Sequence, residues 1–380
     1  MPNMMGEYQP MIAELTRRLR VEPPPLSFLN TSWNNYFDWH AAARAKLVDL
    51  LGYAAAPRPL EQTIEDSFEY NGTLIERVSY AQAFGPRTEG YFLKPIGADG
   101  ALPCVVALHD HGGFKYWGKE KIVALPNEPA MLGKFKEKCY GGLSWASELV
   151  RRGFAVFAPD VFLWGSRKVS LDAIPEYASE AYRHHPAGSP ESIEAYNAFT
   201  AAHENIVAKS LFLSGSTWAG VMVADDMRAV DYVTSRADVD AARVGCGGLS
   251  GGGTRSIFLS ALDDRIACSF CAGFMSDFHS LANERIDRHT WMYHVPLLSR
   301  YMDLHDVYSL HAPKPILALY NIDDPLFTLE GQRASDSALS RIFAKANAAD
   351  NYVGSFYPGA HKFDAQMQHD AFAFLEKWLL

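Results

Sequence analysis

Residues 248–252 read Gly-Leu-Ser-Gly-Gly and fit the pattern G-x-S-x-G. This pattern is typical of a nucleophile elbow, a sharp turn between a strand and a helix that exposes one serine hydroxyl above a sheet. Because such a turn strains the backbone, residues without a Cβ atom are expected beside the serine. The free N–H groups of the following helix would face a negative charge that develops there. The pattern therefore makes Ser250 a candidate nucleophile.

The same glycines could instead form a phosphate-binding loop. A P-loop needs Gly-Lys-Ser or Gly-Lys-Thr at its end, and this stretch has neither. The dinucleotide pattern G-x-G-x-x-G starts at Gly245, but Ser250 stands where its last glycine should be. The nucleophile interpretation is therefore favoured, provided that the chain also supplies an acid and a base.

A serine nucleophile needs a carboxylate to orient its base, and in one known arrangement the chain order is serine, acid, histidine. The apolar run 315–320 leads into Asn-Ile-Asp-Asp-Pro, where Asp323 and Asp324 compete for this role. We favour Asp324 because it directly precedes the proline turn. Asp277 and Asp160 also follow expected strands and remain alternatives.

His361 is the favoured base. It lies in the glycine-containing loop Pro-Gly-Ala-His that follows the last expected strand, at residues 352–357. Strand, loop and chain order therefore agree for this histidine. Other histidines lack the spacing of a metal-binding face, and we expect no metal and no organic cofactor; they are His279, His289, His294, His305, His311 and, in the C-terminal helix, His369.

A tetrahedral intermediate also needs two N–H donors. One is expected from Gly251, the residue after the nucleophile. The second is expected from the loop after the apolar run 104–108, which reads His-Asp-His-Gly-Gly-Phe. We predict the N–H of Gly113, with Phe114 as the alternative, and expect the preceding side chains to brace the loop.

These residues must be positioned by a scaffold of alternating strands and helices. Short, wholly apolar strands are expected at 104–108, 155–158, 244–247, 266–271, 316–320 and 352–356, with helices at 143–152, 219–236, 256–262, 329–348 and 365–379. Such alternation predicts a mostly parallel twisted sheet flanked by helices, an α/β fold. Ligands in such sheets bind at the carboxyl ends of the strands, where the candidate residues lie.

The pattern changes before and within this region. Residues 1–60 look like a helical N-terminal arm, with helices expected at 11–19 and 33–51; apolar Phe37, Ala41, Leu47 and Leu51 have helical spacing in the second. Residues 63–95 alternate with period two and predict an antiparallel entry to the sheet. The catalytic domain would then span 61–380. The long stretches 114–142 and 161–218 fit the scheme poorly, and we interpret 161–218 as a lid-like insertion.

Composition limits the classes of function. The 380 residues are 48% hydrophobic and 21% charged, with a net charge of −9 and no dense basic block, which argues against nucleic acid or an anionic membrane as a partner. Residues 1–20 carry no apolar signal-like run, and four of the five cysteines (Cys104, Cys246, Cys268 and Cys271) are expected to be buried and reduced, so we predict a cytoplasmic protein. A redox or metal role for Cys268 and Cys271 is disfavoured because strand alternation separates them. The N-terminal arm could cover part of the core or contribute to a homo-oligomer.

Taken together, these motifs resemble the α/β-hydrolase superfamily, in particular its dienelactone-hydrolase-like and acetyl xylan esterase-like members. The resemblance covers about 63–380 and rests on the segments 108–113, 158–160 with 164–165, 225–232, 239–252, 261–266 and the loops of Asp324 and His361. It implies ester hydrolysis through an acyl-serine, without a cofactor. Dienelactone hydrolases proper use cysteine, so Ser250 favours an esterase.

The sequence therefore predicts a serine hydrolase that cleaves a small-molecule carboxylic ester. Ser250 would attack, His361 would accept its proton, Asp324 would orient the ring, and Gly113 and Gly251 would hold the oxyanion. The alternatives are a peptidase of the prolyl oligopeptidase type and a non-catalytic binding protein. Aromatic residues expected near the mouth suggest a flat, apolar or sugar substrate; they are Phe114, Trp117, Trp145, Trp164 and Trp218.

Overall fold

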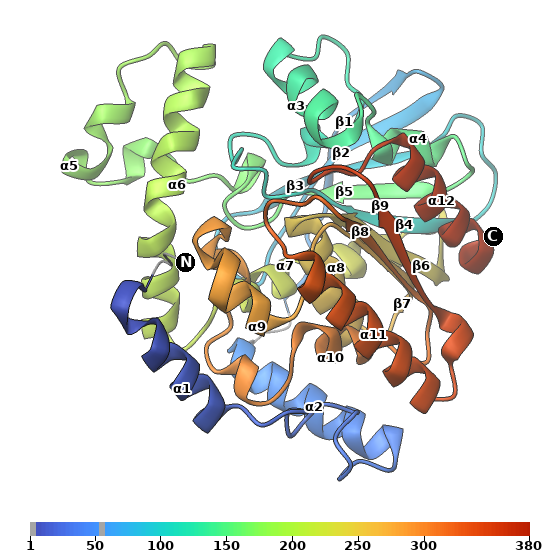
Figure 1. The fold of residues 1–380 in the computed structure, drawn as a ribbon. Helices are drawn as coiled ribbons and strands as arrows, with labels where there is room; N and C mark the ends of the chain where they lie inside the picture. Colours follow the sequence, from blue (N-terminus) through green and yellow to red (C-terminus); the bar gives the residue numbers. More distant parts are fainter. Residues whose placement is uncertain (1–4, 53–57) are drawn as a thin grey trace.

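The computed structural model describes residues 5–52 and 58–380, and a nine-stranded sheet forms its centre. The strand order is β1-β2-β3-β5-β4-β6-β7-β8-β9. The first three strands and β5 pair antiparallel, and every other neighbouring pair is parallel. Strands and helices alternate along the chain from β4 onward, so that helices cover both faces of the sheet (Figure 1).

The strands agree closely with the predicted ones. They are β1 (Thr63–Tyr70), β2 (Thr73–Tyr80), β3 (Thr88–Pro95), β4 (Leu102–Leu108), β5 (Ala155–Pro159), β6 (Val239–Leu249), β7 (Ile266–Ala272), β8 (Ile316–Asn321) and β9 (Tyr352–Tyr357). The predicted antiparallel entry and mostly parallel sheet are therefore confirmed. The largest difference is β6, which extends to the residue before Ser250 instead of ending at residue 247.

The helices are α1 (Gln9–Leu19), α2 (Tyr36–Leu51), α3 (Ala130–Tyr140), α4 (Trp145–Val150), α5 (Glu176–Ser179), α6 (Pro190–Leu213), α7 (Trp218–Thr234), α8 (Gly251–Leu262), α9 (Phe278–Ser280), α10 (Leu304–Ser309), α11 (Leu329–Lys345) and α12 (Ala365–Leu379). The helix expected at 256–262 begins earlier, at Gly251 directly after Ser250, so the expected start was wrong. Its first free N–H groups therefore lie beside the serine.

Alternating side chains of the central strands divide the core into two layers. Val105 and Ala107 pack with α4 and α12, whereas Val106 and Leu108 face α7 and α8 on the other side. The same alternation places Cys268 and Cys271 in different clusters, as predicted. All five cysteines are buried and free. Burial raises the pKa of the Cys246 thiol to about 12, so it remains a thiol at neutral pH.

Helix α2 of the N-terminal arm is part of the core. Its buried residues are Trp39, Ala43, Leu47 and Leu51, four residues apart, and they pack with α7, α8 and α10. The predicted face was wrong in part, because Phe37 is 77% exposed and Ala41 is also exposed. The larger aromatic Trp39, two positions from each, takes the buried face. Helix α1 has no buried residue. Residues 1–4 and 53–57 of the predicted arm lie outside the described residues.

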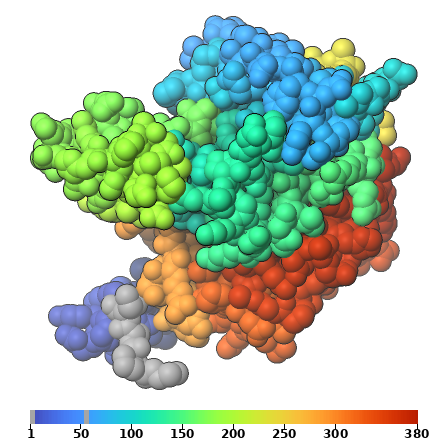
Figure 2. Space-filling view, turned by 90° about the horizontal axis from the view of Figure 1, so that it is seen from above, coloured from blue at the N-terminus to red at the C-terminus, as the bar shows by residue number. Residues whose placement is uncertain are grey.

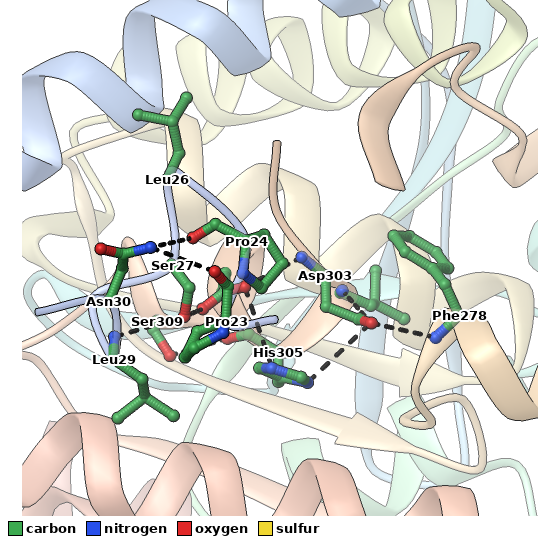
Figure 3. A network of polar contacts seen from close by, with 12 residues as sticks. Pro23, Pro24, Leu26, Ser27, Leu29, Asn30, Phe278, Asp303, His305 and Ser309 are labelled. Carbon is green, nitrogen blue, oxygen red and sulfur yellow. Dashed lines mark hydrogen bonds and ion pairs between the residues drawn. The ribbon is translucent and has the colours of Figure 1, made fainter. Parts of the chain in front are cut away.

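The segment between α1 and α2 is anchored by a buried carboxylate pair. Asp303 caps α10 and accepts the backbone N–H of Phe278, and His305 lies beside it (Figure 3). Arg20 donates to Asp303 at 2.5 Å. The Ser27 hydroxyl donates to Asp306 at 2.6 Å. Because Asp303 and Asp306 are both fully buried, these contacts fix the arm to the core of the fold.

The stretch 161–218 forms a mostly helical insertion dominated by α6. Short turns of 3-10 helix and α5 lead into this 24-residue helix, which begins at a Ser189 cap with Pro190 in its first turn. The yellow-green residues of α5 and α6 project from the side of the molecule (Figure 2). The other poorly fitting stretch, 114–142, contains α3. Both stretches follow strand ends, β5 and β4, as expected for segments that surround a site.

No single helix among the described residues is long and apolar enough to cross a membrane. Helices α6 and α7 meet that length and composition only as a pair, and they are bent by 86° relative to one another.

Candidate active site

Ser250 has a backbone conformation that L-amino acids rarely adopt, with φ 56° and ψ −117°. Its N–H donates to the Ala272 carbonyl of β7 at 2.8 Å. A Cβ atom on Gly248 or on Gly252 would collide with the Leu108 carbonyl at the end of β4. The flanking glycines therefore let the turn pack against the neighbouring strand, and the hydroxyl-bearing residue lies between the ends of β4 and β7.

The predicted acid and base are in contact. His361 Nδ1 lies 2.6 Å from Asp324 Oδ2, and the other carboxylate oxygen of Asp324 accepts the N–H of Leu326 at 2.9 Å. The Asp324 side chain is fully buried, whereas that of His361 is 19% exposed. A buried carboxylate that accepts from Nδ1–H leaves Nε2 as the free basic nitrogen of the ring.

The competing acids have other partners. Asp323 accepts the Gly359 N–H at 2.9 Å, so it holds the turn that carries His361. Asp277 caps α9 by accepting the Ser280 N–H at 2.7 Å. Asp160 is buried and pairs with Lys119 at 2.7 Å. Among the described residues, Asp324 is therefore the only candidate acid that is hydrogen-bonded to the His361 ring.

Gly273 links His361 to the nucleophile. It directly follows Ala272, whose carbonyl accepts the Ser250 N–H, and it has φ +59°. A Cβ atom at Gly273 would lie 3.2 Å from Cε1 of His361. The imidazole therefore lies over Gly273, directly beside the elbow, and the absent side chain leaves room for the ring.

Two backbone N–H groups converge beside Ser250. Gly251 opens α8, and the backbone nitrogen of His111 lies 2.8 Å from the position that a Cβ atom on Gly251 would take. Among the described residues, neither N–H has a hydrogen-bond acceptor. The N–H of Gly113 instead donates to His111 Nδ1 at 2.9 Å. The structure thus brings the His111 N–H to Gly251, two residues earlier in the loop than the predicted Gly113.

Buried cations hold this loop from behind. Lys121, which is fully buried, donates to the Asp110 carbonyl at 2.5 Å. In a trans peptide the C=O and N–H point in opposite directions, so fixing the Asp110 carbonyl directs the His111 N–H to the other side. Arg255, paired with Asp226 at 2.6 Å, donates to the His109 carbonyl at 3.3 Å. Cations therefore hold the carbonyls of the loop, while the His111 nitrogen lies beside Gly251.

The predicted substrate-binding aromatics divide into two groups. Trp164 and Trp218 are fully buried and pack with Met292, whose Cε lies 3.3 Å from the Cβ position of Gly251. Phe114 and Trp117 are partly exposed and contact each other edge to face. Trp145 was wrongly expected near the mouth, because it packs in the core against Phe270 and Phe363.

Phe114 also borders an open cavity of about 380 Å³ between α3 and the insertion. Its lining includes Gly112 and Gly113 of the loop and Glu194 of α6. The cavity therefore adjoins the predicted oxyanion loop, and the insertion forms one of its walls.

The remaining histidines have structural contacts. His289 faces the Leu326 carbonyl at 2.8 Å and His311 the Ser260 carbonyl at 2.9 Å. His305 lies near Asp303, and burial lowers the pKa of His294 to about 4. Within the described residues, no group of three or more His, Cys, Asp or Glu side chains could hold a metal ion.

Sequence reasoning missed Lys121 and Gly273, and it placed the second donor at Gly113. A buried lysine has no periodic signature, and Gly273 is one of 28 glycines in the chain. Chain order alone indicates which loop supplies the donor but not which peptide N–H faces the serine, because that depends on three-dimensional contacts of the loop.

Comparison with known proteins agrees with this architecture. No protein-family model matches the chain. The chain is 29% identical over 340 residues to "Putative hydrolase YtaP" of Bacillus subtilis (strain 168), covering 89% of this chain and 99% of that protein.

Solved structures with similar folds include esterases. A structure described as a "putative acetyl xylan esterase" from Bacteroides fragilis NCTC 9343 matches with a TM-score of 0.69 and 14% identity, over 91% of this chain and 81% of that one. The glucuronoyl esterase of Solibacter usitatus matches with a TM-score of 0.64 and 14% identity, over 93% and 97%. The chain has the α/β-hydrolase fold, and the predicted resemblance to acetyl xylan esterase-like proteins is confirmed for that fold.

Proposed function

We propose that the protein is a serine hydrolase that cleaves a carboxylic ester through an acyl-serine intermediate. The observation that carries the proposal is that a histidine–carboxylate pair and two N–H groups, which have no acceptor among the described residues, lie beside Ser250. The hydrolase name of the Bacillus subtilis relative and the esterase names of the fold neighbours support the same class.

Each group has a defined part in the proposed reaction. The Ser250 hydroxyl attacks the ester carbonyl as His361 Nε2 accepts its proton, and Asp324 stabilises the imidazolium through Nδ1–H. The negative charge that develops on the carbonyl oxygen is held by the N–H groups of Gly251 and His111. His361 then protonates the leaving alcohol. Water repeats the attack on the acyl-serine, with His361 again as base, and releases the acid.

The positive dipole end of α8 adds to this stabilisation, because Ser250 is its N-cap and Gly251 its first residue. The proposed substrate is a small-molecule ester. Met292, which packs on the buried pair Trp164 and Trp218, brings its methyl group beside Gly251, which favours an apolar group of the substrate at that position.

The proposal is tested with p-nitrophenyl acetate and the variant Ser250→Ala. We expect turnover to fall by at least ~10⁴-fold, since the variant has no nucleophile. The matched control is Ser256→Ala, which removes a hydroxyl of α8 that donates to the Gly252 carbonyl one turn earlier in the helix. It should keep near wild-type turnover. Undiminished hydrolysis by Ser250→Ala would reject the assignment.

A further inference from the structure

Glu204 is a buried carboxylate in the middle of α6, the long helix of the insertion. Its Oε1 atom lies 2.6 Å from Nε2 of His111 and 2.5 Å from Nζ of Lys115. Its Oε2 atom accepts the Thr290 hydroxyl at 2.7 Å and the Trp291 N–H at 3.3 Å. One side chain of the insertion therefore contacts the loop of the second N–H donor and the segment that carries Met292.

The surroundings of Glu204 favour its charged form. Burial alone would raise its pKa, but the hydrogen bond from His111 and the nearby charge of Lys115 lower the pKa below its ordinary value. Lys115 is itself buried and lies over the rings of Trp164 and Trp218, 5.2 Å and 5.9 Å from their centroids. Glu204 is thus a carboxylate that accepts from donors on both oxygens.

This carboxylate determines the tautomer of His111. Nδ1 of His111 accepts the Gly113 N–H, so Nδ1 carries no proton. Burial lowers the pKa of His111, which keeps the ring neutral at ordinary pH. The single ring proton must therefore be on Nε2, where it is donated to Glu204. The ring is held at both nitrogens, by the insertion on one side and by its own loop on the other.

The backbone of His111 is consequently fixed by contacts on two sides. Lys121 holds the Asp110 carbonyl behind the loop, and the Glu204–His111–Gly113 chain holds the side chain and the turn that follows. The His111 N–H between them lies against Gly251. A catalytic donor needs such support, since a shift of about 1 Å can reduce turnover by ~10²-fold.

We propose that Glu204 is a positioning residue of the oxyanion hole: from the insertion, it orients His111 so that the backbone N–H of His111 faces the reacting oxygen. This inference rests on the proposed ester hydrolysis at Ser250. It gives the insertion a part in catalysis, because contacts from α6 add to those of Lys121 in holding the donor in place.

The variant Glu204→Gln tests the proposal. Glutamine has nearly the same shape, but its amide nitrogen replaces one acceptor oxygen and would face either His111 and Lys115 or Thr290 and Trp291. We expect kcat for p-nitrophenyl acetate to fall by ~10–10²-fold, less than the ~10²–10³ of losing a donor outright. KM should change by less than about threefold, because the oxyanion forms only after binding.

A transition-state analogue separates positioning from loss of folded protein. A trifluoromethyl ketone forms a tetrahedral adduct with a serine nucleophile, and its oxyanion would use the same N–H groups. Its Ki for Glu204→Gln, on enzyme titrated for active sites with a fluorophosphonate, should rise by the same factor as kcat/KM falls. The matched control is Glu191→Gln, an exposed carboxylate in the first turn of α6, which should leave both quantities near wild type.

Thr290→Val, which removes one donor to Oε2 and also the acceptor of the Met292 N–H, covers the case that Glu204→Gln does not fold. It should shift kcat and Ki in the same directions by a smaller factor. Unchanged Ki in the folded variants, with or without a lower kcat, would overturn the positioning role. Failure of the underlying function is recognised separately, since wild type would then hydrolyse the ester no faster than Ser250→Ala.

Discussion

At the scale of single residues, Ser250 is held in a strained conformation by its neighbours. Its positive φ brings a penalty of roughly 1–3 kcal/mol for a residue with a Cβ atom. The hydrogen bond from the Ser250 N–H to the Ala272 carbonyl and the close packing of Gly252 against β4 hold the turn in this conformation. The strain is the condition for exposing the hydroxyl above the strand ends.

This strain predicts the relative stability of two inactive variants. Ser250→Gly relieves the strain and Ser250→Ala retains it, while both lose the hydroxyl. We expect Ser250→Gly to be the more stable of the two by about 1 kcal/mol in the free energy of unfolding. Urea unfolding of the two variants measures the difference. A more stable alanine variant would show that the elbow is not strained.

The sequence was sufficient for some residues of the site and not for others. Ser250, Asp324 and His361 could be named because each follows a recognisable strand in a known chain order. The donor loop could also be named, but the facing N–H could not. We propose that Lys121 and Glu204 set its direction; they are 10 and 93 residues from His111 and contact it only in the folded chain.

At the scale of elements, the apolar strands were readily predicted and the helices of the insertions were not. The buried strands are continuous apolar runs such as Val-Val-Ala-Leu in β4, a pattern that is typical of parallel strands covered on both faces. Helix α6 has buried residues such as Tyr196 and Glu204 among many polar ones, so it lacks a clear apolar stripe. Apolar periodicity also assigns a glutamate to the exposed face of a helix. Glu204 is buried instead, because its hydrogen-bond partners come from other segments of the chain.

Helix α2 was predicted correctly as a helix, but its buried face was predicted partly wrongly. The spacing of Phe37 and Ala41 fits a helix as well as that of Trp39 and Ala43 does. Trp39 decides between them, since its ring is fully buried against Phe28 and Tyr36. The arm thereby supplies part of the core that covers α7 and α8, rather than a detachable extension.

This packing predicts that the arm and the sheet unfold together. Leu47→Ala removes a fully buried side chain of α2 and should lower the free energy of unfolding by about 2–5 kcal/mol in a single transition. Phe37→Ala, on the exposed face of the same helix, should change it by less than about 0.5 kcal/mol. Urea unfolding followed by fluorescence and circular dichroism checks both. A separate early transition in Leu47→Ala would contradict the shared core.

At the scale of the whole molecule, parallel strand order explains why distant residues meet. Strands β4, β6, β8 and β9 all end at the same edge of the sheet, and they carry the donor loop, Ser250, Asp324 and His361 respectively. The insertion after β5 reaches the same edge through Glu204. The site is therefore assembled from segments between residues 109 and 361, which only this topology brings together.

The central claim is that Ser250 is an activated nucleophile, and covalent labelling tests it most directly. Wild-type protein is treated with a fluorophosphonate, digested, and analysed by mass spectrometry for the labelled peptide. We predict one label per chain, on Ser250, with labelling lost in Ser250→Ala and at least ~10²-fold slower in His361→Ala. A folded wild-type protein that takes no label, or takes it on another serine, would contradict the account.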